Sequence, residues 1–280
     1  MKYKVTLLAE NTTYRHNAIA QHGQSILIES DEYKLLFDVG EIEGAITHNL
    51  NALNISIDSI NDILISHRHI DHVGALPAMM NLLKSQRLFL PLQMGEPHIK
   101  KHPNKYKFLV PNSDGGYDLS ISQEKALELN QYTGVKIVDN AGFQLAKNIY
   151  TTGCVGDWMQ EQAIVVNQME KGITLIVGCS HPSVEVLLEK AIKVTGNSKV
   201  RGIIGGMHYT DYSDEEIESR IDYLETLDLE FIVPSHCTTV RGNLHLKNRL
   251  GDKVILSETY SFGVGNSITI GDEIELDFVG

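Results

Sequence analysis

His-Arg-His-Ile-Asp-His, residues 67–72, places three imidazoles and a carboxylate on one short stretch of chain. The apolar residues 62–66 before it are typical of a strand, and apolar residues recur at helical spacing over 73–83 after it. In a chain of 280 residues with 12 histidines, this pattern should arise by chance about once in a thousand such chains. We therefore predict a functional site on a loop that joins a strand to a helix.

The chemistry of this loop points to metal binding. Imidazoles and a carboxylate that become buried need hydrogen bonds or a cation to offset the free-energy cost of losing their contacts with water. Their spacing lets His67 and His69 face one ion while Asp71 and His72 face a second. Nitrogen and oxygen ligands suit Zn²⁺, and also Fe or Mn. The alternative is a solvated histidine-rich surface loop, which the preceding apolar strand disfavours.

Further histidines follow three apolar segments downstream. His181, His208 and His236 each come just after such a segment, and the carboxyl ends of neighbouring strands meet at one edge of a sheet. We expect His181 and His236 to be metal ligands and His208 to lie in the site without a fixed role. Cys179 falls on the same strand face as His181 if the strand continues, and it could be a thiolate ligand or a small buried side chain.

The order of elements predicts an α/β fold. Sets of strands alternate with helices on both sides of the midpoint of the chain, which fits two sheets packed face to face and covered outside by helices. We treat residues 1–280 as a single domain, with an insertion or lid at about 93–140, where prolines and a Gly-Gly pair interrupt regular patterns. Strands are expected at 5–8, 25–28, 33–37, 62–66, 162–167, 172–177, 200–204 and 231–234, and helices at 73–83, 123–129, 183–194 and 214–227.

Composition narrows the class of partner. The hydrophobic content of 42% supports a sizeable core, and the net charge of −12 argues against broad contact with nucleic acid phosphates. A small-molecule substrate is therefore favoured. No run approaches the roughly 18 apolar residues of a membrane span, and the first residues do not form a secretory signal. Three cysteines without CxxC spacing suggest reduced thiols, so we expect a cytoplasmic protein and leave its oligomeric state open.

Three motifs resemble the metallo-β-lactamase superfamily over nearly the whole chain. They are Leu-Phe-Asp-Val-Gly at 36–40, the histidine loop within 65–74, and Val-Gly-Cys-Ser-His at 177–181. The resemblance implies an αββα sandwich of two mixed sheets covered by helices, with a two-metal centre. It also implies that Asp38 braces the ligand loop from behind.

One branch of that superfamily is more similar still. The segments 10–12, 22–25, 178–181, 205–208 and 235–238 resemble dihydropterin-ribofuranosylaminobenzene-phosphate synthase, an activity of methanopterin biosynthesis. Two usual ligands are nevertheless missing from this chain. Residues 151–156 hold no histidine where most members have one, and Gly178-Cys179 stands where a Gly-Asp normally supplies a bridging carboxylate. The resemblance implies that His181 replaces one of them, and either one or two ions can bind.

These observations predict a metal-dependent hydrolase that acts on a small ester or phosphate-containing molecule through a metal-activated water. Asp71 would orient the water or take its proton, and His208 would protonate a leaving group. The first alternative is a pterin-dependent transferase of the synthase branch, in which the same ions would polarise a pyrophosphate leaving group. The second is a non-catalytic metal-binding or sensing module, which the complete ligand set and the lid disfavour.

Overall fold

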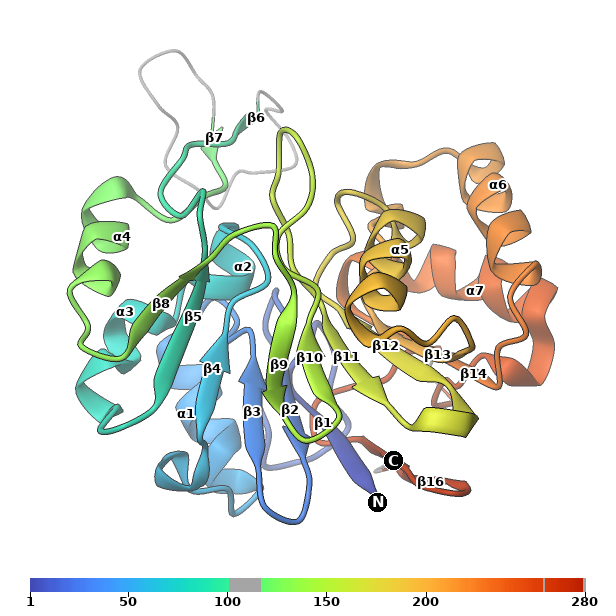
Figure 1. Ribbon diagram of the computed structural model, residues 1–280, viewed down its shortest axis with the longest axis horizontal. Coiled ribbons are helices and arrows are strands. Elements are labelled where there is room, and N and C mark those ends of the chain that lie inside the picture. The colour runs from blue at the N-terminus through green and yellow to red at the C-terminus, as the bar shows by residue number, and fades with distance from the viewer. Residues whose placement is uncertain (101–116, 259, 279–280) are drawn as a thin grey trace.

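Two mixed sheets pack face to face in the computed structural model, which describes residues 1–100, 117–258 and 260–278 (Figure 1). The first sheet has eight strands, antiparallel from its C-terminal edge to β3 and parallel beyond it. In spatial order they are β16 (Ile274–Asp277), β15 (Ser267–Ile270), β1 (Tyr3–Ala9), β2 (Ser25–Glu29), β3 (Lys34–Phe37), β4 (Asp62–Leu64), β5 (Arg87–Pro91) and β8 (Val135–Val138).

The second sheet has six strands and is also mixed. Its three C-terminal strands run parallel to one another, and the other three pair antiparallel. In spatial order they are β14 (Phe231–Pro234), β13 (Val200–Gly205), β12 (Ile173–Val177), β11 (Ile164–Asn167), β10 (Ile149–Thr151) and β9 (Phe143–Ala146). A short pair, β6 (Ile99–Lys100) and β7 (Tyr117–Asp118), stands apart from both sheets (Figure 1).

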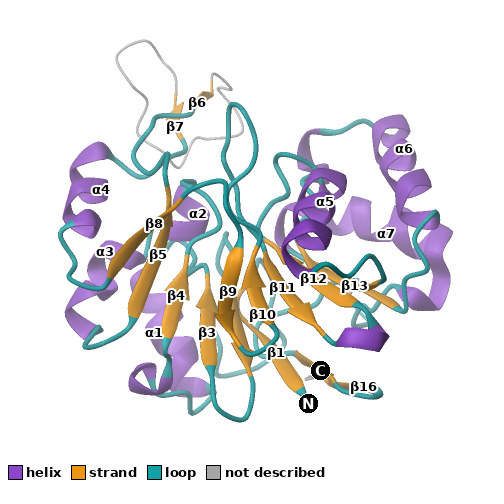
Figure 2. Ribbon diagram, viewed as in Figure 1, coloured by secondary structure: helices purple, strands orange, loops and turns teal. Residues whose placement is uncertain are grey.

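Helices cover the outer face of each sheet (Figure 2). The first sheet is covered by α1 (Glu43–Ala52), α3 (Leu76–Met79) and α4 (Gln123–Asn130), and the second by α5 (Val184–Thr195), α6 (Asp214–Glu225) and α7 (Thr239–Leu250). Three buried apolar clusters result. One fills the space between the sheets and includes Phe37, Leu64 and Ile164, and each of the other two joins a sheet to its helices. This arrangement confirms the predicted αββα sandwich.

The helix expected over 73–83 is broken into pieces. The chain forms α2 (Ile70–Val73), then α3, then a 3₁₀ turn at Met80–Leu82. Pro77 has no N–H to continue a helix from the preceding turn. Gly74 also packs so closely that a Cβ there would lie 2.4 Å from the carbonyl oxygen of Ile70. The histidine loop is therefore followed by short helical turns rather than by one long helix.

The segment expected to be an insertion or lid divides into two parts. Within 93–140, α4 and β8 belong to the sandwich, because β8 pairs with β5 as the edge strand of the first sheet. The β6–β7 pair is the part that stands apart, and residues 101–116 between its strands lie outside the described residues. The single-domain assignment and the lid remain predictions.

Candidate metal centre

Asp38 holds the histidine loop in place at the end of β3. Its Oδ1 accepts the backbone N–H of Ser66 at 2.7 Å, and its Oδ2 accepts the Ser66 hydroxyl at 2.8 Å. The same Oδ2 lies 2.7 Å from Nδ1 of His72. Both Asp38 and His72 are fully buried. This contact keeps the proton of His72 on Nδ1, so that Nε2 can face the centre as an acceptor.

The first group of candidate ligands consists of His67, His69 and His181. Nε2 of His67 and Nδ1 of His69 lie 3.0 Å apart, and Nε2 of His181 lies 3.2 Å and 3.1 Å from them. Burial holds the pKa values of all three well below the usual histidine value, so the rings are neutral. Each neutral ring has a proton on only one of its two nitrogens. The three nitrogens that face this point therefore cannot all obtain a hydrogen-bond donor from one another. A cation fits this arrangement of lone pairs.

The second group consists of Asp71, His72 and His236. Oδ2 of Asp71 lies 3.0 Å from Nε2 of His236 and 3.8 Å from Nε2 of His72. Burial would raise the pKa of Asp71, but the two histidines lower it well below its usual value. Burial lowers the pKa of His72, but Asp38 and Asp71 raise it by more, to about 9. The carboxylates of Asp38 and Asp71 thus flank the buried ring of His72. A divalent cation can bind there in place of the extra proton of that ring.

Cys179 joins the two groups. Its Sγ lies 3.1 Å from Nε2 of His72, and its donor atom falls within 4.8 Å of those of His67 and His181 and also of those of His72 and His236. The thiol therefore stands between the two groups, where the superfamily places a bridging carboxylate. His181 lies with His67 and His69, in the group that lacks the usual third histidine.

A tight turn, and not a continued strand, brings Cys179 and His181 into the centre. The strand β12 ends at Val177, and Ser180 adopts a left-handed conformation with φ 61°. A Cβ at Gly178 would lie 2.4 Å from the Ser66 hydroxyl, so only glycine allows this approach. The expectation that Cys179 and His181 share a strand face is therefore wrong, although both still reach the centre.

Glu161, which the sequence did not single out, organises this turn. Its buried carboxylate accepts the backbone N–H groups of Cys179, Ser180 and His181 at 2.8 to 2.9 Å. Burial raises the pKa of Glu161 to about 7, although these hydrogen bonds lower it. No local pattern marks this residue, because its partners lie 18 to 20 positions away along the chain.

Residues near the N-terminus hold His236 in the second group. Glu10 accepts the backbone N–H of His236 at 2.8 Å, and Oδ1 of Asn11 lies 3.2 Å from its Nδ1. His22 approaches Oδ2 of Asp71 at 3.4 Å with a side chain that is 57% exposed, so it is a further candidate ligand. All three occur in segments that carry the resemblance to the synthase branch, which was the signal that could have marked them.

His208 lies beside the first group rather than within it. Its ring centroid is 4.3 Å from that of His181, and its backbone N–H donates to the thiol of Cys237 at 3.3 Å. Nε2 of His208 lies 3.7 Å from a carboxylate oxygen of Asp211. Burial lowers the pKa of His208, but Asp211 and Cys237 raise it by more, to about 9. The ring can therefore carry a proton at neutral pH.

A cavity of about 140 Å³ opens onto both groups. It is lined by His69, Asp71, Cys179, His208 and His236 from the centre, and by Lys100 and Asp211, which pair at 2.8 Å, from β6 and the turn after β13. The cavity therefore gives one space access to the first group through His69 and to the second through Asp71 and His236.

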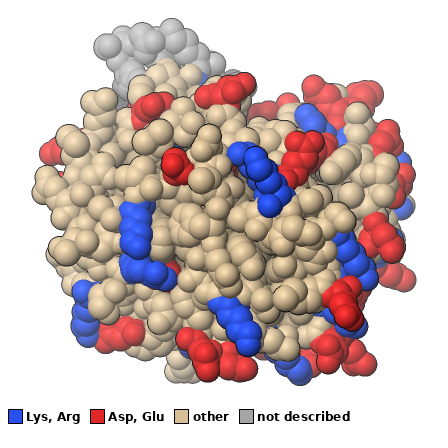
Figure 3. All heavy atoms as spheres, in the orientation of Figure 1, with Lys and Arg blue, Asp and Glu red and all other residues tan. Residues whose placement is uncertain are grey.

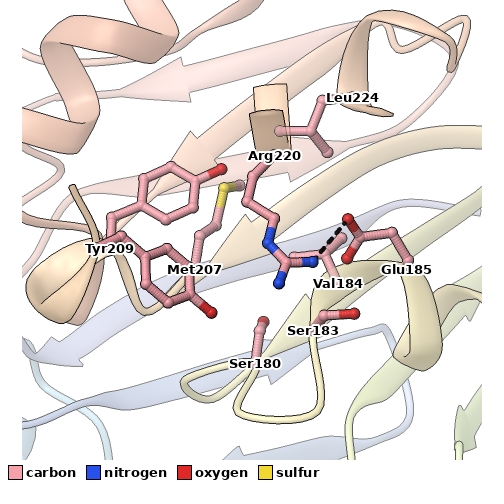
Figure 4. Close-up of a pocket in the computed structure, with 9 residues that line it drawn as sticks. Ser180, Ser183, Val184, Glu185, Met207, Tyr209, Arg220 and Leu224 are labelled. Atoms are coloured by element: carbon pink, nitrogen blue, oxygen red, sulfur yellow. Dashed lines mark hydrogen bonds and ion pairs between the residues drawn. The ribbon is translucent and has the colours of Figure 1, made fainter. Parts of the chain in front are cut away.

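A second hollow on the other side of the turn at 178–181 is too small for a substrate. Figure 4 shows the guanidinium of Arg220 pointing to the carboxylate of Glu185, with Ser180 nearby, and the ion pair measures 3.3 Å. About 10 Å³ remains there, close to the minimum for one water molecule. This region packs α5 against α6, and the larger cavity is the candidate substrate site.

One face of the molecule shows how the charged side chains are distributed. On the face shown in Figure 3, the Lys and Arg side chains are separate from one another and lie among Asp and Glu.

None of the helices in the described part of the chain has the length and apolar character of a membrane span.

Solved structures identify the class of protein. A crystal structure described as a metal-dependent hydrolase of the beta-lactamase superfamily aligns with a TM-score of 0.73 and 23% identity, over 96% of this chain and 100% of that chain. The metallo-beta-lactamase fold protein YhfI from Bacillus subtilis aligns with a TM-score of 0.60 and 13% identity, over 96% and 99%. The protein therefore has the metallo-β-lactamase fold, as its motifs implied.

Sequence comparison identifies the family. The model of the Anti-Pycsar protein Apyc1 family matches residues 15–197, which is more than half of the chain, so the chain belongs to this family. A Methanocaldococcus jannaschii protein named 7,8-dihydropterin-6-methyl-4-(beta-D-ribofuranosyl)-aminobenzene-5'-phosphate synthase is 28% identical over 267 residues, which cover 84% of this chain and 87% of that protein. The Anti-Pycsar protein Apyc1 of Bacillus phage 010DV004 is 41% identical over 56 residues, or 20% of this chain and 21% of that protein. The resemblance to the synthase branch is thus confirmed.

Proposed function

We propose that this protein is a metal-dependent hydrolase that cleaves a small phosphate ester, with Zn²⁺ as the expected cation at one or two positions. The proposal rests mainly on the two adjacent ligand groups that share Cys179 and open onto one cavity. When bound, such cations lower the pKa of a coordinated water and polarise a phosphoryl oxygen. The donor set is nitrogen and sulfur with one carboxylate, which suits zinc better than magnesium or calcium.

Two groups at the cavity support a phosphate-containing substrate. His208 has a pKa of about 9, so it is protonated at neutral pH and can donate to a phosphoryl or leaving-group oxygen. Lys100 also lines the cavity, where its ammonium pairs with Asp211. The ionised Asp71 can accept a hydrogen bond from the attacking water and orient it. The small cavity and the net charge of −12 fit a small molecule rather than a nucleic acid.

A transferase is the second candidate, because the relative from Methanocaldococcus jannaschii carries a synthase name. In that reaction an aromatic ring would attack instead of water, with a pyrophosphate leaving from the pterin substrate. The two reactions differ in stoichiometry. A hydrolase consumes its substrate in buffer alone, whereas the transferase needs both co-substrates in the same tube.

The test combines metal analysis with a substrate screen. Purified protein would be analysed for metals and assayed on phosphomonoester, phosphodiester, cyclic nucleotide, lactone, thioester and β-lactam substrates. We expect turnover of at least one phosphate ester, and its loss in His67→Ala together with bound metal. Turnover confined to lactones or thioesters would contradict the substrate class. Activity that persists in His67→Ala without metal would contradict the site.

A further inference from the structure

We propose that Trp158 is a stacking platform that binds a planar ring of the substrate beside His181 of the first ligand group. This inference rests on the proposed function, and it adds a specificity-determining residue and a substrate feature. Trp158 is the single tryptophan of the chain and lies on the loop between β10 and β11, which projects beyond the sheets beside β6 and β7 (Figure 1).

The indole is exposed although it lies against the centre. Its residue is 53% exposed, yet its ring lies 5.2 Å, between centroids, from the ring of His181 in an edge-to-face arrangement. A second ring beside the indole, among the described residues, is that of His98 at 5.0 Å, and His98 in turn stacks on His69 at 4.9 Å. Trp158 therefore contacts the first ligand group directly through His181, and it keeps a large part of its surface open to solvent.

The loop that carries Trp158 is held rigidly. Nη2 of Arg68 donates to the backbone carbonyl of Trp158 at 3.0 Å, and Nη1 donates to Oε1 of Gln93 at 2.7 Å. The same oxygen of Gln93 accepts the N–H of Gln160 at 2.9 Å. Val155 and Glu161 exchange two backbone hydrogen bonds of 2.9 Å across the base of the loop. An aromatic side chain on such a base loses little conformational freedom when a ligand stacks on it.

The ligand that this geometry fits has two parts. The flat, exposed indole can receive an aromatic heterocycle by offset stacking. A polar group attached to that ring would then reach the ligand groups next to His181. The alternative is that Trp158 only shields His181 from water, in which case its removal would change metal retention and not ring recognition.

The experiment uses three probes on the metal-loaded protein. Adenosine 5'-monophosphate carries a ring and a phosphate, ribose 5-phosphate lacks the ring, and adenosine lacks the phosphate. Binding would be followed by calorimetry and by the fluorescence of the single tryptophan. We expect adenosine 5'-monophosphate to bind about 5- to 100-fold more tightly than ribose 5-phosphate and to change the fluorescence saturably.

Variants assign that difference to the indole. Trp158→Ala should abolish the preference for the ring, with the affinity for ribose 5-phosphate and the metal content unchanged, and Trp158→Phe should keep most of the preference. Leu127→Ala, at a 63% exposed residue on α4, is the matched control and should behave as the wild type. Equal binding of the two phosphates by the wild type, an equal loss for both in Trp158→Ala, or unchanged ring preference in that variant would overturn the inference.

The same data separate this inference from the proposed function. If neither phosphate binds, the phosphate-ester proposal fails, and adenosine decides the role of Trp158. Saturable quenching by adenosine would then sustain the platform, and no response to any probe would overturn both proposals.

Discussion

Asp38→Asn tests how the centre is held, because it changes one atom of a fully buried group. If the amide nitrogen takes the place of Oδ2, it faces Nδ1 of His72, which must then accept and pass its proton to Nε2. A protonated Nε2 has no lone pair for a cation. If the nitrogen takes the place of Oδ1, it faces the backbone N–H of Ser66, so that two donors meet in a buried space.

The magnitude follows from these contacts. The second placement sets two buried donors against each other, and the first removes the oxygen that accepts the Ser66 hydroxyl, so either should lower the free energy of unfolding of the metal-free protein by about 1–3 kcal/mol. Loss of the carboxylate that orients His72 should weaken metal affinity by about 10- to 100-fold. Denaturant unfolding measures the first quantity, and titration of zinc against a chelator of known affinity measures the second.

Asp62→Asn is the matched control. Asp62 is a buried aspartate at the start of β4, whereas Asp38 bonds Ser66 beyond the end of that strand. It accepts the Nε–H of Arg87 at 2.7 Å and the hydroxyl of Tyr33, and within the described part of the chain these polar partners lie outside the centre. We expect Asp62→Asn to lose stability but to keep wild-type metal affinity. Wild-type affinity in Asp38→Asn, or an equal loss of affinity in both variants, would refute the reasoning.

Three further predictions follow from the geometry of the centre. His67→Ala should remove metal from the first group and His236→Ala should lower the metal stoichiometry through the second, both measured by elemental analysis; full occupancy in either would exclude that ligand. His208→Ala should retain metal but lose about 10²- to 10⁴-fold in turnover, and loss of an ion instead would make His208 a ligand. The metal-free protein should lose stability as the pH falls below about 6.5, by at most about 4 kcal/mol per pH unit, because the three histidines of the first group have lowered pKa values and bind protons more readily when unfolded. A flat unfolding free energy between pH 6.5 and 5 would contradict it. His72 has the opposite sign, since its pKa is raised to about 9 and its contribution is lost as the pH rises through that value.

Much of the fold could be predicted from local patterns. The helix α6 begins at its predicted start, where Ser213 forms a capping box with Glu216, and α4 and α5 begin within one residue of their predicted starts. Four other elements have weaker helix or strand patterns in the sequence. The helices α1 and α7 and the C-terminal strands β15 and β16 were not predicted, and these elements owe their form to packing against the sheets.

Some of the candidate site residues could be predicted from the sequence, and others could not. The loop 67–72 and the histidines at 181 and 236 could be placed because each follows an apolar strand, and the ends of parallel strands meet at one edge. His98 was not selected as a site residue, since nothing in its immediate neighbours distinguishes it from an ordinary polar residue. His22 and Cys237 lie in segments that resemble the synthase branch, but neither was selected from them.

The sequence by itself determined the class of fold and the donor types, because strand and helix periods and the chemistry of imidazole are local properties. Only the tertiary structure decided which donors belong together. The grouping of His181 with His67, the position of Cys179 between the groups, and the support from Glu161 all depend on a left-handed turn at Ser180 and on contacts between the two sheets. Such contacts join residues far apart in the chain, so their distances are set by the packing of the whole sandwich and not by any short stretch of sequence.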